Sequence, residues 1–342
     1  MIKTLMEKEA ASAGEKIELQ LKANKPLWQE ICAYLSANKP VFAATVARGS
    51  SDHAANFAKY VLETQLGLIT ASIAPSVYTN YHAKTRHDNA LFFGLSQSGK
   101  SPDLIQSFKA VSDKATTIAL VNVEDSPLAS VSRFVVPLHA GAEKSVAATK
   151  SYISALVAMV QFVAIHNNDK ILTQALDRLP QYLQEAAELD WIQATDCFKL
   201  IKSTYIIGRG FGYPIAQEAA LKLKETSAIH SEPFSSAEVL HGPFELVKPG
   251  FPVLIFAQND QTAANTIALA RRLDDMGANV LFAMPGNKTI IGKTLPTTAS
   301  LHPLLDPILL IQSFYMMAAK LAVARGLNPD APANLNKVTE TL

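Results

Sequence analysis

Short apolar runs alternate along the chain with longer segments whose apolar residues follow a helical period. The segment from Asp103 onward is helical in this sense, because its apolar residues recur at three- and four-residue steps. The short runs instead have the length and composition of buried strands. Strands that alternate with helices at this spacing predict an α/β fold with a mainly parallel sheet. The strands predicted in the first half are 41–47, 69–73, 90–95, 116–121 and 134–138.

The second half of the chain repeats this plan. Residues 205–210 restate the pattern of residues 45–50, and a helical segment follows each of them. The offset between the two is roughly one domain length. We therefore predict two similar domains, each a doubly wound, mainly parallel sheet flanked by helices in a flavodoxin-like three-layer sandwich. Further strands are predicted at 252–257 and 279–284, and further helices at 262–276 and 307–325.

The predicted domain ranges follow from the same pattern. Residues 1–40 are predicted to form an N-terminal helical segment, in which charged and apolar residues alternate. Residues 41–199 are predicted to form the first domain, with a helix over 170–198 that connects it to the second. Residues 200–342 are predicted to form the second domain and a C-terminal tail.

Composition narrows the class of protein. Of the 342 residues, 49% are hydrophobic and 18% are charged, which is typical of a compact protein with a large core. The formal net charge of +1 gives no electrostatic reason to expect nucleic-acid binding. The N-terminus has no apolar signal core, and the longest apolar runs, such as 153–165, are too short for a membrane span.

The cysteines and histidines suggest neither a disulfide nor a metal site. Cys32 and Cys197 lie far apart in sequence, without metal-ligand spacing, so we expect reduced thiols and a cytoplasmic protein. No cluster of histidines and carboxylates has the spacing of metal ligands. We therefore expect neither a metal nor a cofactor.

A hydroxyl-rich turn between the predicted strand 90–95 and the helix from Asp103 is the first candidate site. It reads Ser-Gln-Ser-Gly-Lys-Ser-Pro from Ser96 to Pro102. Free N–H groups at the helix start, the helix dipole and several hydroxyl groups together favour an anion. The spacing is not that of a P-loop, so a nucleoside triphosphate is not expected. An ordinary capped turn would have a similar composition and remains the alternative.

A second candidate is an acid–base group on the helical segment after residue 210. Glu218, Lys222 and Glu225 are spaced i, i+4, i+7 and therefore share one helix face. A solvated ion-pair stripe would have the same spacing. The rest of the helix is mostly apolar, however, which leaves little surface for such a stripe. His241 follows in a turn-forming loop and is an acid–base candidate, whereas Lys337 lies in the tail, where most lysines are solvated.

Five motifs occur together in one order, and as a set they resemble the sugar isomerase (SIS) domain family. Within that family, the chain is similar to the isomerase half of glucosamine-6-phosphate synthases from about residue 35 to its end. The motifs are Ser96-Gln97-Ser98-Gly99, Ala140-Gly141-x-Glu143 with Ala148-Thr149-Lys150, Glu218-x-x-x-Lys222-x-x-Glu225, Leu240-His241-Gly242-Pro243 and Asn334-Leu335-x-Lys337-Val338-Thr339.

The resemblance implies a role for each candidate residue. Glu225 would move a proton between C1 and C2 of a sugar phosphate, His241 would open the sugar ring, and Lys337 would act at the carbonyl. Glu218 and Lys222 would support this site. The chain would form a homodimer, with His241 reaching in from the neighbouring subunit. The residues that would hold the phosphosugar are Ser50, Ser51, Ser96, Gln97, Ser98, Ser101, Val146 and Ala148.

The chain also departs from the synthase pattern. Ile2 stands where the synthase has a nucleophilic cysteine, and only about forty residues precede the first predicted domain, so we expect no glutaminase. Lys100 replaces a glutamate, and Ala333 replaces an arginine. We therefore expect a glucosamine-6-phosphate deaminase that makes fructose 6-phosphate and ammonia. The alternatives are a galactosamine-6-phosphate deaminase, a deglycase of fructosamine-type 6-phosphates and a non-catalytic phosphosugar sensor.

Overall fold

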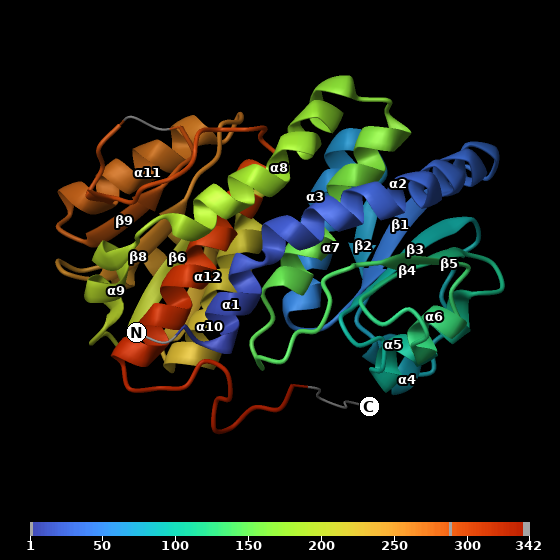
Figure 1. The fold of residues 1–342 in the computed structure, drawn as a ribbon, viewed down its shortest axis with the longest axis horizontal. Coiled ribbons are helices and arrows are strands. Elements are labelled where there is room, and N and C mark those ends of the chain that lie inside the picture. The colour runs from blue at the N-terminus through green and yellow to red at the C-terminus, as the bar shows by residue number, and fades with distance from the viewer. Residues whose placement is uncertain (1–2, 287–288, 338–342) are drawn as a thin grey trace. The chain divides into compact units, whose positions relative to one another are not determined.

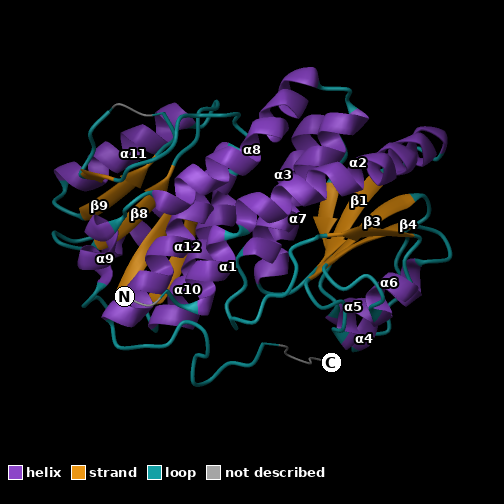
Figure 2. Ribbon diagram, viewed as in Figure 1, coloured by secondary structure: helices purple, strands orange, loops and turns teal. Residues whose placement is uncertain are grey.

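The computed structural model describes residues 3–286 and 289–337. Two five-stranded sheets, each flanked by helices, form the centres of two compact units (Figures 1 and 2). The amino-terminal unit comprises residues 15–143 and 150–177, and the carboxy-terminal unit comprises residues 3–14, 144–149 and 178–337. The domain ranges expected from the sequence stay a prediction, because a compact unit can include segments from distant parts of the chain.

The sheet of the amino-terminal unit is parallel throughout, with the strand order β2-β1-β3-β4-β5. Its central strand β3 is buried along its whole length, as its continuous apolar sequence predicts. Each predicted strand of this half is present within one residue of the expected bounds. The strands are β1 (Phe42–Val46), β2 (Thr70–Ser72), β3 (Ala90–Ser96), β4 (Thr116–Val121) and β5 (Phe134–Pro137).

Helices cover both faces of this sheet (Figure 1). Phe92 points to one face and packs with Phe108 and Leu128, whereas Phe93, the next residue, packs on the other face near Phe162. This alternation is the two-residue period of a strand. The helices of the first face are α4 (Ser76–Thr79), α5 (Pro102–Val111) and α6 (Pro127–Ser130), and those of the second are α2 (Ala13–Ala37), α3 (Ser50–Leu66) and α7 (Lys150–His166).

The sheet of the carboxy-terminal unit has the order β10-β9-β8-β6-β7 and is also parallel. Numbered from its own first strand, it has the same 2-1-3-4-5 order as the other sheet, which is the flavodoxin-like order. The prediction of two similar doubly wound domains is therefore confirmed. The strands are β6 (Ser203–Gly208), β7 (His230–Ser235), β8 (Pro252–Phe256), β9 (Asn279–Ala283) and β10 (Lys293–Thr294).

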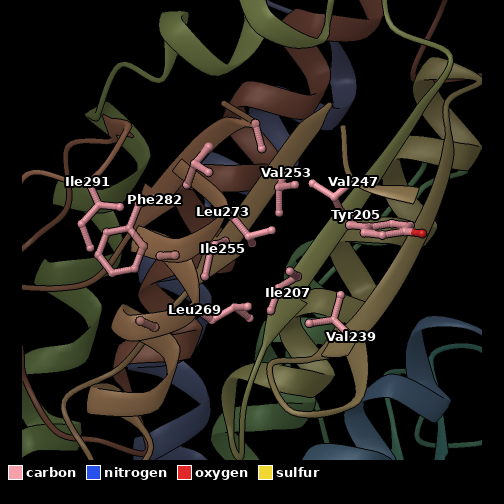
Figure 3. Close-up of a cluster of buried hydrophobic side chains, with 14 of the residues drawn as sticks. Tyr205, Ile207, Val239, Val247, Val253, Ile255, Leu269, Leu273, Phe282 and Ile291 are labelled. Atoms are coloured by element: carbon pink, nitrogen blue, oxygen red, sulfur yellow. The ribbon is translucent and has the colours of Figure 1, made fainter. Parts of the chain in front are cut away.

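A core of aliphatic and aromatic side chains fills one face of this second sheet (Figure 3). Ile207, Ile255 and Phe282 from three neighbouring strands meet Leu269 and Leu273 of the covering helix α11. This face is covered by α11 (Ala263–Asp275) and by the short 3₁₀ helices η1 (Glu238–Leu240) and η2 (Pro243–Leu246). The remaining helices of the chain are α1 (Leu5–Ala11), α8 (Lys170–Glu188), α9 (Ile192–Phe198), α10 (Gly212–Ser227) and α12 (Asp306–Ala324).

Three details of the sequence-based prediction are wrong. The helix expected over 170–198 is two helices, α8 and α9, because Trp191 turns inward between them. Its indole is buried and donates a hydrogen bond to the Pro296 carbonyl at 2.8 Å. The strands β7 and β10 were not expected, since β7 is rich in polar residues and β10 is very short. Helix α3 begins at Ser50, three residues before the expected start.

Helix α12 is the one helix among the described residues that is long and apolar enough to cross a membrane. However, 83% of its apolar window is buried inside the protein, which is typical of a core helix. Gln312 in this helix donates a hydrogen bond to the Ala10 carbonyl of α1 at 3.0 Å. We therefore interpret α12 as the central core helix of its unit.

Candidate functional site

The hydroxyl-rich turn lies at the switch point of the first sheet, where the loops after β1 and β3 leave adjacent strands in opposite directions. Ser96 ends β3, and its hydroxyl accepts a hydrogen bond from the Gly99 amide at 3.0 Å. The Ser98 hydroxyl accepts from the Lys100 amide at 3.3 Å. The loop therefore folds back on itself and brings its hydroxyl groups close to the first turn of α5.

Gly99 is required by the geometry of this loop. Its φ of +62° lies in the left-handed region, and a Cβ atom there would lie 2.1 Å from the Ser126 hydroxyl oxygen. That oxygen is buried and has no hydrogen-bond partner within the described residues. The close approach of the loop to Ser126 thus depends on the absence of a side chain at residue 99.

The helix starts at the switch point carry several of the predicted residues. Ser101 is the N-cap of α5, as expected, but its hydroxyl makes no capping hydrogen bond. Gly49 caps α3 without a side-chain hydrogen bond, and Ser50 and Ser51 form the first turn of that helix, both partly buried. Gln97 is also partly buried. The structure thus places the six predicted residues Ser50, Ser51, Ser96, Gln97, Ser98 and Ser101 on the two loops of one switch point.

An ion pair that sequence reasoning missed joins these two loops. Arg48, after β1, donates through its Nε to Asp103 Oδ2 of α5 at 2.9 Å. The Asp103 side chain is fully buried, whereas half of the Arg48 side chain is exposed. The pair therefore fixes the distance between the two helix starts and leaves part of the guanidinium facing solvent. The only indication of Arg48 in the sequence was the Arg-Gly pair that is repeated after β1 and β6. Its pairing with Asp103 depends on the fold and could not be predicted.

Asp52, in the first turn of α3, lies beside this pair. Burial raises the pKa of the Asp52 carboxyl, and the nearby positive charges of His53 and Arg48 partly offset this effect. A carboxylate at a helix start competes with a bound anion for the same N–H groups. The raised pKa therefore reflects the cost of holding a charge on a partly buried carboxyl.

Val146 and Ala148 lie in a segment that belongs to the carboxy-terminal unit. Glu9 accepts hydrogen bonds from the amides of Lys144 at 2.6 Å and Ser145 at 3.2 Å, and the Val146 amide donates to the Asp330 carbonyl at 3.1 Å. The residues flanking Val146 and Ala148 are buried, whereas these two are partly exposed. The segment is thus fixed by its backbone and presents alternate side chains outward.

Glu218, Lys222 and Glu225 form a buried ion cluster on α10. The Lys222 ammonium contacts Glu218 Oε1 at 3.3 Å and has a shorter contact with Glu225 Oε2. The side chains of Glu218 and Lys222 are fully buried, and the Glu225 side chain is 21% exposed. The alternative of a solvated ion-pair stripe is therefore wrong, since two of its three members have no contact with solvent.

The electrostatics of this cluster keep Lys222 charged. Burial acts to lower the pKa of Lys222, but the charges of Glu218 and Glu225 outweigh it, so the pKa stands above its usual value. Tyr315 of α12 donates its hydroxyl hydrogen to Glu218 Oε1 at 3.0 Å. Sequence reasoning missed Tyr315, because its helix reads as continuous core. Glu225 is thus the one carboxylate of the cluster that is accessible to a ligand.

The remaining two candidates, His241 and Lys337, lie in a loop and in the C-terminal tail. His241 directly follows η1 and is exposed, and within the described residues its side chain makes no hydrogen bond or ion pair. Lys337 is the last described residue and is partly buried. Across residues 3–286 and 289–337, no group of three or more histidines, cysteines or carboxylates could hold a metal ion.

Comparison with known proteins identifies the family. The SIS domain family matches residues 42–165 and 200–288, which is more than half of the chain, so this chain belongs to the SIS domain family. It is 33% identical over 299 residues to a glutamine–fructose-6-phosphate aminotransferase (isomerizing) from Methanothermobacter thermautotrophicus. That alignment covers 85% of this chain and 50% of the relative, so the chain spans about half the length of the curated relatives it matches.

Two solved structures are similar over nearly the whole chain. A proposed phosphosugar isomerase from Silicibacter pomeroyi DSS-3 has a TM-score of 0.90 and 40% sequence identity, with 96% of this chain and all of that chain covered. The C-terminal domain of the glucosamine-fructose-6-phosphate aminotransferase from Francisella tularensis has a TM-score of 0.86 and 25% identity, with coverage of 97% and 98%. The resemblance stated from the five motifs is thereby confirmed.

Proposed function

We propose that this protein is a phosphosugar aldose–ketose isomerase that acts as a deaminase, converting glucosamine 6-phosphate to fructose 6-phosphate and ammonia. The observation that carries the proposal is the ion cluster on α10, in which one carboxylate, Glu225, remains accessible while its neighbours are buried. Isomerisation needs a single base that can reach two adjacent carbons, and a base held by a buried lysine has a fixed position.

The loops of the first sheet would hold the phosphate of the substrate. Ser96, Ser98 and Ser101 offer hydroxyl groups, and the starts of α3 and α5 offer amides and the positive ends of two helix dipoles. Ser50, Ser51, Gln97, Val146 and Ala148 would complete the contacts with the sugar. This assignment favours a dianionic phosphate over a neutral sugar.

The proposed reaction has three steps. His241 opens the sugar ring of glucosamine 6-phosphate, which gives the aldehyde at C1 and leaves the amine at C2 unchanged. Glu225 then takes the proton from C2 while O1 takes up a proton, which gives an enolamine, and Glu225 returns the C2 proton to C1 while the nitrogen loses one proton. The aldehyde thereby becomes an alcohol and the amine becomes an imine, fructosimine 6-phosphate. Water adds to the C2 imine and ammonia leaves, which gives fructose 6-phosphate. Lys337 would stabilise the negative charge that develops at the carbonyl oxygen.

The similarity to the aminotransferases supports isomerase chemistry, and the departures at Lys100 and Ala333 support a substrate different from theirs. A galactosamine-6-phosphate deaminase or a fructosamine-6-phosphate deglycase would use the same ion cluster with a different pocket. A homodimer with His241 donated across its interface, and a cytoplasmic location, remain predictions.

Ammonia release from glucosamine 6-phosphate without glutamine tests the proposal directly. Purified protein should release ammonia and fructose 6-phosphate in equal amounts, the latter followed by a coupled assay. Galactosamine 6-phosphate and fructosamine phosphates serve as parallel substrates. Binding of glucosamine 6-phosphate with no turnover of any of these compounds would contradict the enzymatic assignment and favour a sensor.

A further inference from the structure

A cavity of about 340 Å³ lies in the carboxy-terminal unit, between the ends of β6 and β7 and helix α11. Its polar lining includes Arg209, Arg272, Ser236 and Asn265, and Leu240 and Leu269 form part of its apolar wall. None of these residues belongs to the ion cluster on α10 or to the hydroxyl-rich loop of the first sheet. We propose that this cavity is a second anion site, which binds a small phosphate ester.

The strand order explains why an arginine is available here. Arg209 follows β6 as Arg48 follows β1, so the two arginines occupy corresponding positions in the two sheets. Arg48 is paired with Asp103 in the first turn of α5. The corresponding helix α11 has no acidic residue in its first turn, and Arg209 instead donates to the Ser235 hydroxyl at 3.0 Å.

In the second sheet, a carboxylate lies just before the corresponding helix start. Asp260 Oδ1 accepts hydrogen bonds from the Thr262 amide at 2.7 Å and the Thr262 hydroxyl at 2.6 Å. Asp260 Oδ2 accepts from the side-chain amide of Gln258 at 2.9 Å. The negative charge of Asp260 disfavours an external anion beside this helix start, so the cavity is the side from which an anion would reach Arg209.

The second arginine and the serine complete a cationic, donor-rich lining. The Arg272 guanidinium carbon lies 4.3 Å from the centre of the Phe244 ring, which orients its plane. Ser236 is only 6% exposed, and its hydroxyl lies 3.4 Å from the Thr266 hydroxyl, whose hydrogen is donated to the Thr262 carbonyl at 3.1 Å. The Ser236 hydrogen can therefore be donated either to Thr266 or to a ligand. Among the described residues, neither Arg209 nor Arg272 forms an ion pair.

The chemistry of the lining defines the class of ligand. Two guanidinium groups and a hydroxyl are matched to a phosphate dianion, since arginine binds phosphate oxygens in pairs. The wall of leucines and alanines would contact a carbon skeleton, and the volume is at the lower end of small-molecule sites. A phosphate monoester of sugar size fits both features, whereas a nucleotide would exceed them.

Titration calorimetry of the full-length chain with glucose 6-phosphate tests this site. The double variant Ser96→Ala/Ser98→Ala weakens the first site, and in this background one site per chain should remain. Adding Arg209→Gln and Arg272→Gln should lower its affinity about tenfold or more, because two charge-assisted hydrogen bonds are lost. Arg272→Gln alone, a change at an exposed position, should lower the affinity for glucose 6-phosphate about threefold or more. The thermal unfolding midpoint should stay unchanged.

Arg271→Gln is the matched control, since Arg271 is the exposed neighbour on the same helix and does not line the cavity. The affinity of the Arg271→Gln variant for glucose 6-phosphate should stay within about twofold of that of the Ser96→Ala/Ser98→Ala protein. Equal losses for Arg271→Gln and Arg272→Gln would overturn the site in favour of general surface charge. Absence of binding in the background, or binding of glucose as tight as that of glucose 6-phosphate, would also overturn it. Inorganic phosphate should bind more weakly than the ester, and equal affinity would refute the role of the apolar wall.

Discussion

The two sheets share one strand order, yet their switch points differ in chemistry. At the first, the loop after β3 contains serines that leave the start of α5 accessible, and an arginine is tied to a buried carboxylate. At the second, Asp260 is hydrogen-bonded to Thr262 just before α11, and among the described residues the corresponding arginine has no carboxylate partner. The two sheets therefore have the same switch point, and a few loop side chains determine where an anion can bind.

The two units also divide the proposed chemistry. The hydroxyl-rich loop belongs to the amino-terminal unit, whereas the ion cluster Glu218–Lys222–Glu225 belongs to the carboxy-terminal unit. A binding defect and a catalytic defect should therefore be separable by mutation.

Replacing Glu225 by Gln should lower kcat about 10³-fold, because the amide cannot accept the C2 proton. Affinity for the phosphosugar should change little, since the phosphate contacts are elsewhere. Turnover and calorimetric affinity are measured together, with the exposed Glu232→Gln as control. Unchanged turnover in Glu225→Gln would refute its role as the base.

Lys222→Met should lower the free energy of unfolding by about 3 kcal/mol, because it leaves two carboxylates without their buried cation. Urea unfolding measures the loss, and the exposed Lys224→Met should change stability by less than about 1 kcal/mol. Since the pKa of Lys222 is raised in the folded protein, its contribution should be constant from neutral pH up to the usual lysine pKa and decline only above it. A difference between wild type and Lys222→Met that shrinks already between pH 6 and 9 would contradict this.

Gly99→Ala should destabilise the protein by about 2 kcal/mol or more, whereas Gly210→Ala should cost about 1 kcal/mol. Both glycines have a positive φ, so both substitutions add backbone strain. A Cβ atom added at residue 99 would also lie 2.1 Å from the Ser126 hydroxyl oxygen. A Cβ atom added at residue 210 would lie 3.5 Å from its nearest neighbour, the Thr262 Cγ2. Urea unfolding of both variants checks the order, and equal losses would show that the loop can move away from Ser126.

Asp103→Asn should raise KM about tenfold with a smaller change in kcat, because Arg48 would no longer hold the two loops of the first switch point together. Asp113→Asn, at an exposed position after the same helix, is the control. Steady-state kinetics with glucosamine 6-phosphate separate the two constants. A fall in kcat with KM unchanged would place this pair in the catalytic step rather than in binding.

Asp260→Ala should cost about 1 kcal/mol, because its carboxylate loses hydrogen bonds from Thr262 and from the side-chain amide of Gln258. Asp275→Ala is the control, because a negative charge at the C-terminal end of α11 opposes the helix dipole and its removal should be neutral or slightly stabilising. Chemical denaturation measures both. A loss below about 0.3 kcal/mol for Asp260→Ala would mean that these hydrogen bonds do not stabilise the loop before α11.

The sequence predicted the fold well for a physical reason. Buried parallel strands such as β3 need a continuous apolar run, and that run is visible without any tertiary information. Strand β7 was missed because it is an edge strand, for which polar residues such as His230 and Glu232 are acceptable. The break between α8 and α9 was missed because it depends on where Trp191 is buried, which no local pattern records.

For the candidate site, the chemical groups and their order along the chain can be predicted without any tertiary information. The pattern of residues indicated the hydroxyls of Ser96 and Ser98, the common helix face of Glu218, Lys222 and Glu225, and the family to which the chain belongs. Only the folded chain shows that Lys222 is fully buried, that Arg48 is paired with a carboxylate whereas Arg209 is hydrogen-bonded to Ser235, and that Asp260 is hydrogen-bonded to Thr262 just before α11. Burial and pairing depend on the distances between residues far apart in the chain, and those distances exist only in the folded protein.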